Sequence, residues 1–531
     1  MPDRGLNKVG TRWQAGAVGK GMTIGASEGG RHLWLLAALG CAIPLLLPSI
    51  PPLIDLYGHV ARYHVLAELG SNPFLDRYYD AEWRPIGNLG VDLLVIPLSK
   101  LIGLSAAVKL VVGAIPVLTA LGILQLSRAV HGRISPLALL AVPLSFNSFF
   151  AYGFVNFCLG QALVLLVLAW WLRGGADRSP MVEGALLGCL GLIVWTAHLS
   201  AWGALVIALG AFELARLMAG DKGRAALLGA AVRLLPLGLP LLVMLMWPGP
   251  AHTGPLASDF FDWGWKLGKA ATLLSDPMGL AGVLTPLTLA SVAVAAVAFG
   301  APQRNFPLLL AAGLMWLAVA LLPDHLMGSN LADVRLSPLA LILTLVAFDP
   351  TRNRPLLLAL AAAFLLGRLA VTTWHYHEED RKVSTHLPLL DLVPRGSSVL
   401  TLYGRDCNRS LPGIDRLSHF GALVTWRRDA FTNNGFPEIG TPLRVSFPAA
   451  GPWKDIYHYQ VRPAECLPAS QRSGNPRAMT TEQALASFPR DAFDHVLLVR
   501  PLAAPAAAFA GLTMIEDTGE VRLYRVDRLG R

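Results

Sequence analysis

The sequence is poor in charged residues, and this shortage argues against an ordinary water-soluble globular protein. Lys, Arg, Asp and Glu make up 15% of the 531 residues, whereas a soluble domain is about one quarter charged. Apolar stretches recur from residue 32 to residue 374, and each is near the roughly 20 residues that cross a bilayer as a helix. With a mean hydropathy of +0.50, the chain is predicted to be a polytopic α-helical membrane protein.

Two common binding signatures are also missing. The stretch "GAVGKGMT" fails the phosphate-binding loop pattern, because Gly21 follows Lys20 where Ser or Thr is required and Gln14 occupies the first glycine position. No Asp-x-Asp pair occurs in residues 51–105, and hard cations prefer several oxygen ligands. We therefore expect no cofactor and no metal, with a divalent metal as the open alternative.

Nucleic acid is not expected as a partner, although the net charge is +9. Most of the positive excess lies in short loops between apolar segments, where it acts as an orientation signal for a membrane protein. No aromatic-rich basic strand or recognition helix accompanies it.

Cysteine is scarce, with five in the chain. Cys41, Cys158 and Cys189 fall in apolar segments and are expected to be small apolar packing residues. Cys407 and Cys466 fall outside these segments, and in an oxidising compartment they could form a disulfide. Two unpaired thiols are the alternative, because spacing alone does not fix the separation of the Cα atoms.

The loops between the apolar segments predict an orientation. About eleven spans are expected, and basic loops alternate with acidic or neutral ones if the N-terminus is cytoplasmic. Residues 89–104 would invert every later loop if they crossed, so we interpret them as an interfacial or re-entrant helix. The spans are expected at 32–50, 106–127, 135–151, 155–172, 182–198, 200–217, 225–247, 278–299, 306–322, 331–348 and 355–374.

These assignments divide the chain into three parts. Residues 1–31 are expected to be a disordered, basic cytoplasmic tail, and residues 32–374 a transmembrane domain whose first external loop is 51–105. Residues 375–531 are expected to be a small α/β domain on the periplasmic side of a bacterial inner membrane. Strands are predicted in "SSVLTLYG", in "DHVLLVRP" and on both sides of a turn at residues 517–519.

A polar stripe follows the first apolar segment. In "SIPPLIDLYGHVARYH", Ser49 is a candidate helix cap with prolines in the first turn. A helix starting there would place Asp55, His59 and Arg62 on one face. An ordinary interfacial helix is the alternative interpretation of this stripe.

Further polar groups fall at the same expected membrane face. The rest of the first loop is too long for a simple connector, and Tyr79, Trp83 and Asn88 suit contacts with a sugar or an acceptor. Asn156 lies at a tight external turn, and His198, His325 and Arg335 lie at the ends of spans. An arginine at a helix mouth is a natural phosphate ligand, although a membrane-anchoring role is the alternative for Arg335 alone.

The chain resembles the GT-C superfamily of membrane glycosyltransferases, which includes protein O-mannosyltransferases and the aminoarabinose transferase of lipid A. The resemblance is carried by the first span followed directly by Asp55, the long external loop, the many spans and the external C-terminal domain. "IDLYGHVARY", "WRPIGNLGVDLLV" and "GFVNFCLGQALVLLVLAWWLR" also resemble a group of proteobacterial membrane proteins. Many relatives carry a second acid directly after the first, and this chain has Leu56 there.

The resemblance implies transfer of a sugar from a polyprenyl-phosphate donor to a glycan, lipid or protein acceptor. Asp55 would be the general base, and Arg335, with Arg62 or His59, would stabilise the phosphate leaving group. His198 and His325 would help to bind the donor. Two other classes stay open, namely a transporter or flippase for a lipid-linked glycan and a non-catalytic subunit of an envelope assembly.

Overall fold

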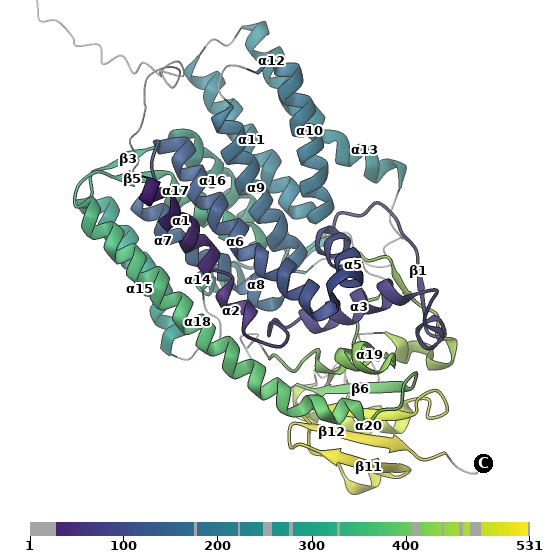
Figure 1. Ribbon diagram of the computed structural model, residues 1–531. Helices are drawn as coiled ribbons and strands as arrows, with labels where there is room; N and C mark the ends of the chain where they lie inside the picture. The colour runs from purple at the N-terminus through teal and green to yellow at the C-terminus, as the bar shows by residue number, and fades with distance from the viewer. Residues whose placement is uncertain are drawn as a thin grey trace, which may run out of the picture.

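The chain folds into a large helical part and a smaller part built on a β-sheet (Figure 1). The computed structural model describes residues 28–174, 178–220, 223–247, 257–274, 280–326, 330–405, 415–437, 440–455, 460–467 and 479–528. The expected tail, residues 1–31, therefore lies almost entirely outside the described residues.

The helical part begins at Glu28 and ends at Asp391. Its first helices are α1 (Glu28–Gly40), α2 (Ile43–Leu46), α3 (Leu56–Glu68), α4 (Pro73–Asp76), α5 (Gly90–Ile102), α6 (Leu104–His131), α7 (Pro136–Ala141), η1 (Val142–Phe146), α8 (Ser148–Tyr152) and α9 (Val155–Arg173). They are followed by α10 (Pro180–Ala197), α11 (Leu199–Ala219), α12 (Arg224–Leu234), η3 (Leu235–Gly238), α13 (Leu239–Met246), α14 (Trp263–Ala271), α15 (Leu280–Phe299), α16 (Phe306–Leu321), η4 (Val334–Leu336), α17 (Ser337–Val346) and α18 (Arg354–Asp391).

Apolar helices dominate this part, so the expected helical class is confirmed. Among the described residues, six helical segments are long and apolar enough to cross a membrane, and five shorter apolar helices accompany them. Two expected spans are interrupted. Residues 135–151 form α7, η1 and α8, and residues 225–247 form α12, η3 and α13, each broken near a proline because proline removes a helical hydrogen bond.

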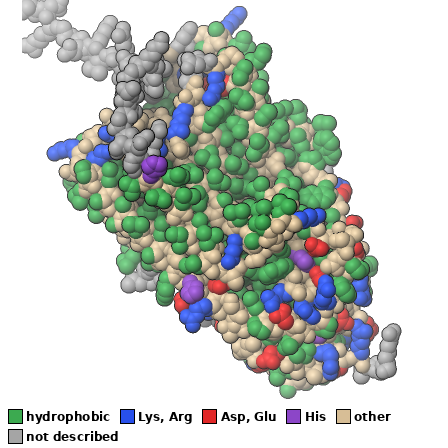
Figure 2. Space-filling model, viewed as in Figure 1, with side chains coloured by type: hydrophobic (Ala, Val, Ile, Leu, Met, Phe, Trp, Pro, Cys, Tyr) green, Lys and Arg blue, Asp and Glu red, His purple; other side chains and the backbone are tan. Residues whose placement is uncertain are grey.

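The surface separates apolar and charged regions. Figure 2 shows hydrophobic side chains covering the helical part, with acidic and basic side chains gathered over the C-terminal part. Leu101, Leu245 and Phe299 are among the exposed large apolar side chains, with 80%, 78% and 73% of their surface accessible. So much exposed apolar surface suits contact with lipid and would be costly in water.

Residues 89–104 form the separate helix α5, which ends at Gly103 before α6 begins. With 13 residues, α5 is about 20 Å long, shorter than a roughly 30 Å hydrocarbon core. Gly103 has φ +81°, a conformation that glycine adopts without strain. Its interfacial position stays a prediction.

The sheet of the C-terminal part has six strands. They are β6 (Ser398–Gly404), β7 (Phe431–Thr432), β9 (Gln460–Val461), β10 (His495–Val499), β11 (Leu512–Asp517) and β12 (Val521–Val526). The order is β11-β12-β10-β6-β7, and β9 also pairs with β6. β10, β7 and β9 run parallel to β6, whereas β12 is antiparallel to both of its neighbours. The predicted strands at 398–404, 495–499 and around the turn at 517–519 are confirmed. The helices of this part are α19 (Leu423–Arg428) and α20 (Thr481–Ser487).

The sheet-bearing part is bound to the helical part through the first loop. Strand β1 (Tyr79–Ala81) pairs antiparallel with β8 (Leu443–Val445). His64 of α3 lies 2.8 Å from Asp429, and Tyr78 donates a hydrogen bond to the Gly396 carbonyl at 2.8 Å. α3 also packs against α19. These contacts hold the C-terminal part against the loop that carries Asp55.

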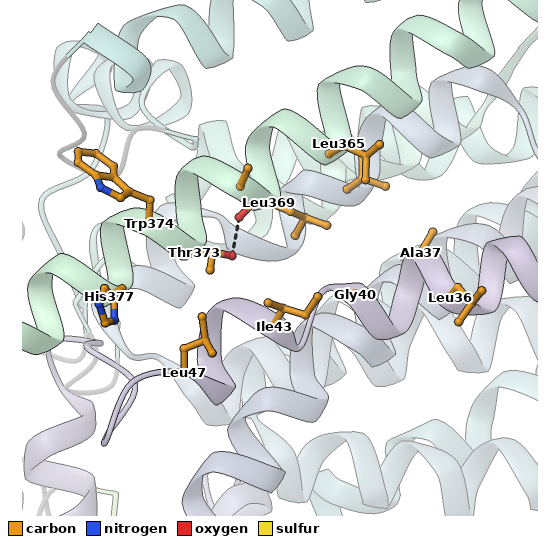
Figure 3. Close-up of a pocket in the computed structure, with 12 residues that line it drawn as sticks. Leu36, Ala37, Gly40, Ile43, Leu47, Leu365, Leu369, Thr373, Trp374 and His377 are labelled. Carbon is orange, nitrogen blue, oxygen red and sulfur yellow. Dashed lines mark hydrogen bonds between the residues drawn. The ribbon is translucent and has the colours of Figure 1, made fainter.

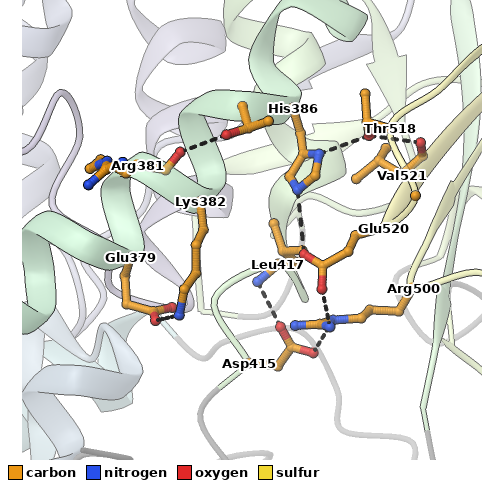
Figure 4. A network of polar contacts seen from close by, with 12 residues as sticks. Glu379, Arg381, Lys382, His386, Asp415, Leu417, Arg500, Thr518, Glu520 and Val521 are labelled. Atoms are coloured by element: carbon orange, nitrogen blue, oxygen red, sulfur yellow. Dashed lines mark hydrogen bonds and ion pairs between the residues drawn. The ribbon is translucent and has the colours of Figure 1, made fainter.

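A polar network joins the far end of α18 to the sheet (Figure 4). The His386 ring lies 2.8 Å from the Thr518 hydroxyl and 3.5 Å from the Glu520 carboxylate. Arg500 pairs with both Glu520 and Asp415. Because α18 begins among the apolar helices and ends in this network, it links the helical part to the sheet-bearing part.

Candidate functional site

The backbone before α3 is fixed by a distant segment. The Ile54 and Asp55 amides donate to the carbonyls of Ala151 and Tyr152 at 3.3 and 2.9 Å. α3 then begins at Leu56, with Asp55 as the residue before it. The Asp55 side chain makes no capping hydrogen bond, so its carboxylate is not used by the helix end.

The expected helix start at Ser49 is wrong. The Ser49 amide and hydroxyl both donate to the Asp380 carboxylate on α18, at 3.0 and 2.7 Å. Residues 51–53 have no helical structure. Ser49 caps no helix: its hydroxyl donates to a carboxylate 331 positions away instead of accepting from a helix amide.

Gly153 makes the approach of these two segments possible. It ends α8 with φ +90°, a region that residues with a side chain rarely adopt. A Cβ atom there would lie 2.9 Å from the Asp55 amide nitrogen and 3.0 Å from that of Leu56. Only glycine lets the turn at 152–154 lie directly against Asp55.

Asp55 is mostly withdrawn from water but still reachable. Its side chain is 21% exposed, and its Oδ1 lies 3.7 Å from Nε2 of His419. Burial raises the pKa of Asp55 to about 7, and the Arg335 charge opposes that rise. A carboxyl with a pKa near neutrality can both take and release a proton at physiological pH.

Two histidines lie beside Asp55. His59 is one turn further along α3, and its ring is 5.3 Å from the Phe436 ring, which in turn is 4.6 Å from the His419 ring. Burial holds the pKa of His59 well below its usual range, with the charges of Arg62 and His419 acting in the same direction. A Cβ on Gly58 would lie 2.4 Å from the Phe436 ring, so Phe436 packs tightly on α3.

Arg335 and His198 form the cationic side of the site. Nη1 of Arg335 lies 3.1 Å from Nε2 of His198, and Nη2 donates to the Asn330 carbonyl at 2.7 Å. The guanidinium stacks 4.7 Å from the centroid of the Phe154 ring. Its Nε is buried and has no hydrogen-bond partner among the described residues, and this unmatched donor suits an anion.

A lysine that sequence reasoning missed lies near the same turn. Nζ of Lys269, on α14, is 3.2 Å from the Tyr152 hydroxyl and 4.6 Å from the Trp265 ring centroid. Burial lowers the pKa of Lys269, and the Asp324 charge opposes this. Because "WGWKLGKAA" reads as an ordinary amphipathic segment, nothing local marked Lys269.

We call the group Asp55, His59, His198, Arg335 and His419 the Asp55 cluster. The structure thus brings together four residues predicted from the sequence, Asp55, His59, His198 and Arg335. His419 was not predicted, because it lies in an irregular stretch with no motif around it.

Arg62 belongs to a different group. Its Nε and Nη2 donate to the two Asp92 carboxylate oxygens at 2.8 and 3.0 Å. Asn156 donates to the same carboxylate at 3.1 Å and accepts from the Val91 amide at 2.6 Å. We call Arg62, Asp92 and Asn156 the Arg62 cluster. It joins α3, α5 and α9, and both arginine and carboxylate are buried.

The remaining predicted residues are spread out. Tyr79 is buried in β1 with its ring 5.9 Å from that of Phe431, and Asn88 donates to the Gly440 carbonyl at 3.3 Å. Trp83 is 51% exposed. His325 lies 2.9 Å from Asp324 and 3.2 Å from Asp259, and Asp324 also accepts from Trp265 beside Lys269.

Four of the five cysteines lie among the described residues. Cys466 is disulfide-bonded, whereas Cys407 lies outside the described residues, so their pairing stays a prediction. Cys41 and Cys158 are buried, as expected for core residues, whereas Cys189 is exposed, so that expectation is wrong for Cys189; all three are free thiols. No group of three or more His, Cys, Asp or Glu that could hold a metal occurs among the described residues.

An apolar groove of about 510 Å³ lies between α1, α2 and α18 (Figure 3). Leu36, Ile43, Leu365 and Leu369 are among its lining residues. Its Thr373 hydroxyl is turned to the Leu369 carbonyl, so the walls are almost entirely hydrocarbon. The groove contains no member of the Asp55 cluster.

No family model matches the chain, and no curated protein sequence matches it. Among solved structures, the chain is similar to the arabinofuranosyltransferase AftD from Mycobacteria, with a TM-score of 0.49 and 15% sequence identity. The match covers 94% of this chain and 40% of that one, so this chain corresponds to less than half of AftD.

Proposed function

We propose that the chain is an integral membrane glycosyltransferase that moves a sugar from a polyprenyl-phosphate donor to an acceptor hydroxyl. The observation that carries this proposal is the Asp55 carboxylate, partly exposed at the end of the first apolar segment and close enough to Arg335 for its charge to act on it. A base and a nearby cation are what a displacement at a sugar phosphate requires.

In the proposed reaction, Asp55 takes the proton of the acceptor hydroxyl. The acceptor oxygen forms a bond to the anomeric carbon of the sugar, and the bond from that carbon to the phosphate oxygen breaks with its electron pair. The leaving group is a lipid phosphate, whose negative charge Arg335 and Lys269 stabilise. The buried, unmatched Nε of Arg335 supports this assignment, because a phosphate oxygen would supply the missing acceptor.

We assign the residues around this centre by their contacts. His198 orients Arg335, and His59 lines the acceptor side next to Asp55. His325 acts indirectly through Asp324, while Trp83 is the exposed aromatic residue of the first loop that suits a sugar. The Arg62 cluster, Tyr79 and Asn88 hold the loop in place.

We further propose that the protein lies in a bacterial inner membrane with about eleven spans. The N-terminus would be cytoplasmic, and the C-terminal domain and the Asp55 cluster would be periplasmic. The charged C-terminal surface and the apolar helical surface in Figure 2 support a boundary between water and lipid at this level. The partners are then the bilayer, the donor lipid and a glycan, lipid or protein acceptor.

The test uses purified full-length protein in proteoliposomes. A panel of undecaprenyl-phosphate hexoses and pentoses, labelled in the sugar, is supplied with envelope extract, and release of undecaprenyl phosphate is measured. The wild type and the matched control Asp80→Asn, an exposed acid of the same loop, should turn over one donor. Asp55→Asn should not, although it should fold and bind undecaprenyl phosphate.

Two outcomes would favour the other classes. Movement of an intact labelled lipid across the bilayer, unaffected by Asp55→Asn, would indicate a flippase. If neither turnover nor transport is detected in the wild type or in any variant, and the protein stably captures other envelope proteins, the chain is an assembly subunit and the proposal is overturned.

A further inference from the structure

A histidine of the sheet-bearing part reaches the candidate base. His419 lies directly before η5 (Phe420–Ala422) and is 6% exposed. Its Nε2 faces Oδ1 of Asp55 at 3.7 Å, somewhat beyond hydrogen-bond length. Catalytic hydrogen bonds are often this loose before substrate binds and shorten afterwards.

The contact of the other ring nitrogen, Nδ1, fixes the tautomer of His419. Nδ1 lies 3.3 Å from the Asn434 backbone carbonyl. A carbonyl can only accept, so Nδ1 carries the hydrogen and Nε2 of the neutral ring presents a lone pair to Asp55. Two lone pairs facing each other repel, and one proton between Oδ1 and Nε2 removes the repulsion.

The ring has little freedom to turn away. Phe436 packs against both His419 and His59, and the side-chain oxygen of Asn434 accepts from the Ala422 amide at 3.2 Å. The neighbouring Arg416 donates to the Ala151 carbonyl at 2.9 Å, one residue from the carbonyl that binds the Asp55 amide. The loop bearing His419 is therefore held against the same turn as Asp55.

We propose that His419 is a positioning residue for Asp55, and that it holds Oδ1 through one shared proton so that Oδ2 faces the acceptor hydroxyl. This inference rests on the proposed function. When Oδ2 takes the hydroxyl proton, the shared proton lies on Nε2, and one proton is later released to water. The C-terminal domain is then part of the catalytic centre.

Burial raises the pKa of Asp55 to about 7 and lowers that of His419 to about 4. Both groups therefore favour their neutral forms, and the proton between them rests on Asp55 until Oδ2 takes a second proton. α3 carries the titratable or charged groups Tyr57, His59, Arg62, Tyr63, His64 and Glu68. The neighbouring segments add Tyr152, His198, Lys269, Arg335, Asp415 and Arg416.

The experiment follows the Asp55 carboxyl directly. Infrared difference spectra of the full-length protein are recorded against pH, and the Asp55 band is assigned by its absence in Asp55→Asn. In His419→Leu, the protonated carboxyl loses its acceptor, so the midpoint should fall by about 0.5 to 1 pH unit. His419→Gln retains an acceptor oxygen and should restore most of the midpoint.

Turnover supplies the second readout. His419→Leu should lower kcat at least tenfold while the donor KM changes less than twofold, and His419→Gln should recover part of kcat. His377→Leu, which replaces an exposed histidine of α18, is the matched control and should behave as wild type. Thermal unfolding of each variant reports whether it is folded.

The two proposals fail in different ways. An Asp55 midpoint that is the same in wild type and folded His419→Leu overturns the shared proton, whatever turnover does. If His419→Leu does not fold, a folded His419→Gln with the kcat of the wild type overturns the shared proton instead, because a glutamine amide cannot take up that proton. A shifted midpoint together with no turnover on any donor leaves the pair intact and overturns the transferase.

Discussion

Two buried polar clusters meet α3, and they differ in how completely they are satisfied. In the Arg62 cluster, arginine, carboxylate and amide are matched to one another at 2.6 to 3.1 Å. In the Asp55 cluster, the nearest ion-pair distance to Asp55 is 3.7 Å, and buried nitrogens of His59 and Arg335 have no hydrogen-bond partner among the described residues.

The difference separates stability from chemistry. A fully matched buried network holds elements in one arrangement, and the Arg62 cluster does this for α3, α5 and α9. Unmatched buried groups cost free energy, and the proposed function accounts for those of the Asp55 cluster by a ligand that completes them. Under that proposal, the same helix carries a structural face and a functional face.

The largest effect is expected from Asp55→Asn. Removing a general base typically lowers turnover by about 10² to 10⁴-fold, and the thermal unfolding temperature should hardly change because Asp55 makes no capping hydrogen bond. Turnover in proteoliposomes and thermal unfolding in detergent are the measurements. A variant that is both inactive and unfolded would place Asp55 among the structural residues.

In contrast to Asp55→Asn, Asp92→Ala should mainly lower the stability of the fold. It leaves the Arg62 guanidinium buried without its carboxylate, which typically costs about 3–5 kcal/mol. Unfolding in denaturant measures this loss. The double variant Arg62→Leu/Asp92→Leu should be more stable than Asp92→Ala, since no buried charge is left unpaired, and equal stability of the two would contradict this account.

Arg335→Gln should weaken binding of undecaprenyl phosphate. Hydrogen bonds to a charged group contribute about 1.5–3 kcal/mol, which corresponds to roughly 10- to 150-fold in Kd. Binding is measured by titration of the protein in detergent micelles. Arg133→Gln removes an arginine that pairs with Asp349, outside the Asp55 cluster, and should leave this affinity unchanged.

Gly153→Ala tests the contact that positions Asp55. A non-glycine residue at positive φ costs about 1–3 kcal/mol, and the new Cβ would push against the Asp55 amide. Stability should fall and turnover per folded molecule should fall with it. Gly132→Ala adds a Cβ at φ +70° with open space around it, so it should lose stability without loss of turnover.

The smallest effect is expected from pH. Because burial raises the pKa of Asp55 to about 7, its free carboxylate form is lost as pH falls below 7. In His419→Leu, where no imidazole can take up the shared proton, the residual turnover should therefore decrease about tenfold per pH unit on the acid side. An acid limb near pH 4, the ordinary range of a solvated aspartate, would show that Asp55 is not the titrating base.

Much of the fold was predictable because apolar residues recur along the sequence in regular patterns. The apolar helices and the strands at 398–404, 495–499 and 512–526 follow from runs and alternation that nearby residues specify. The breaks at η1 and η3 were harder, because a proline such as Pro116 lies within an unbroken α6 while others end a helix. Tertiary packing decides which of these happens.

The site was predictable only in part. An acid directly after the first apolar segment, and cations at helix ends, identified Asp55, His198 and Arg335 as candidates. The same reasoning placed Arg62 beside them, because helical spacing puts residues on one face but does not say which neighbour that face meets. Asp92 supplied that neighbour, 30 positions away.

The sequence by itself determined that this is a helical membrane protein with a charged C-terminal sheet, since burial of apolar side chains in lipid depends on composition and period alone. Only the tertiary structure decided that His419 and Phe436 from beyond residue 400 meet Asp55 and His59 before residue 60. Such a meeting depends on which surfaces pack across hundreds of residues, and no local pattern encodes it.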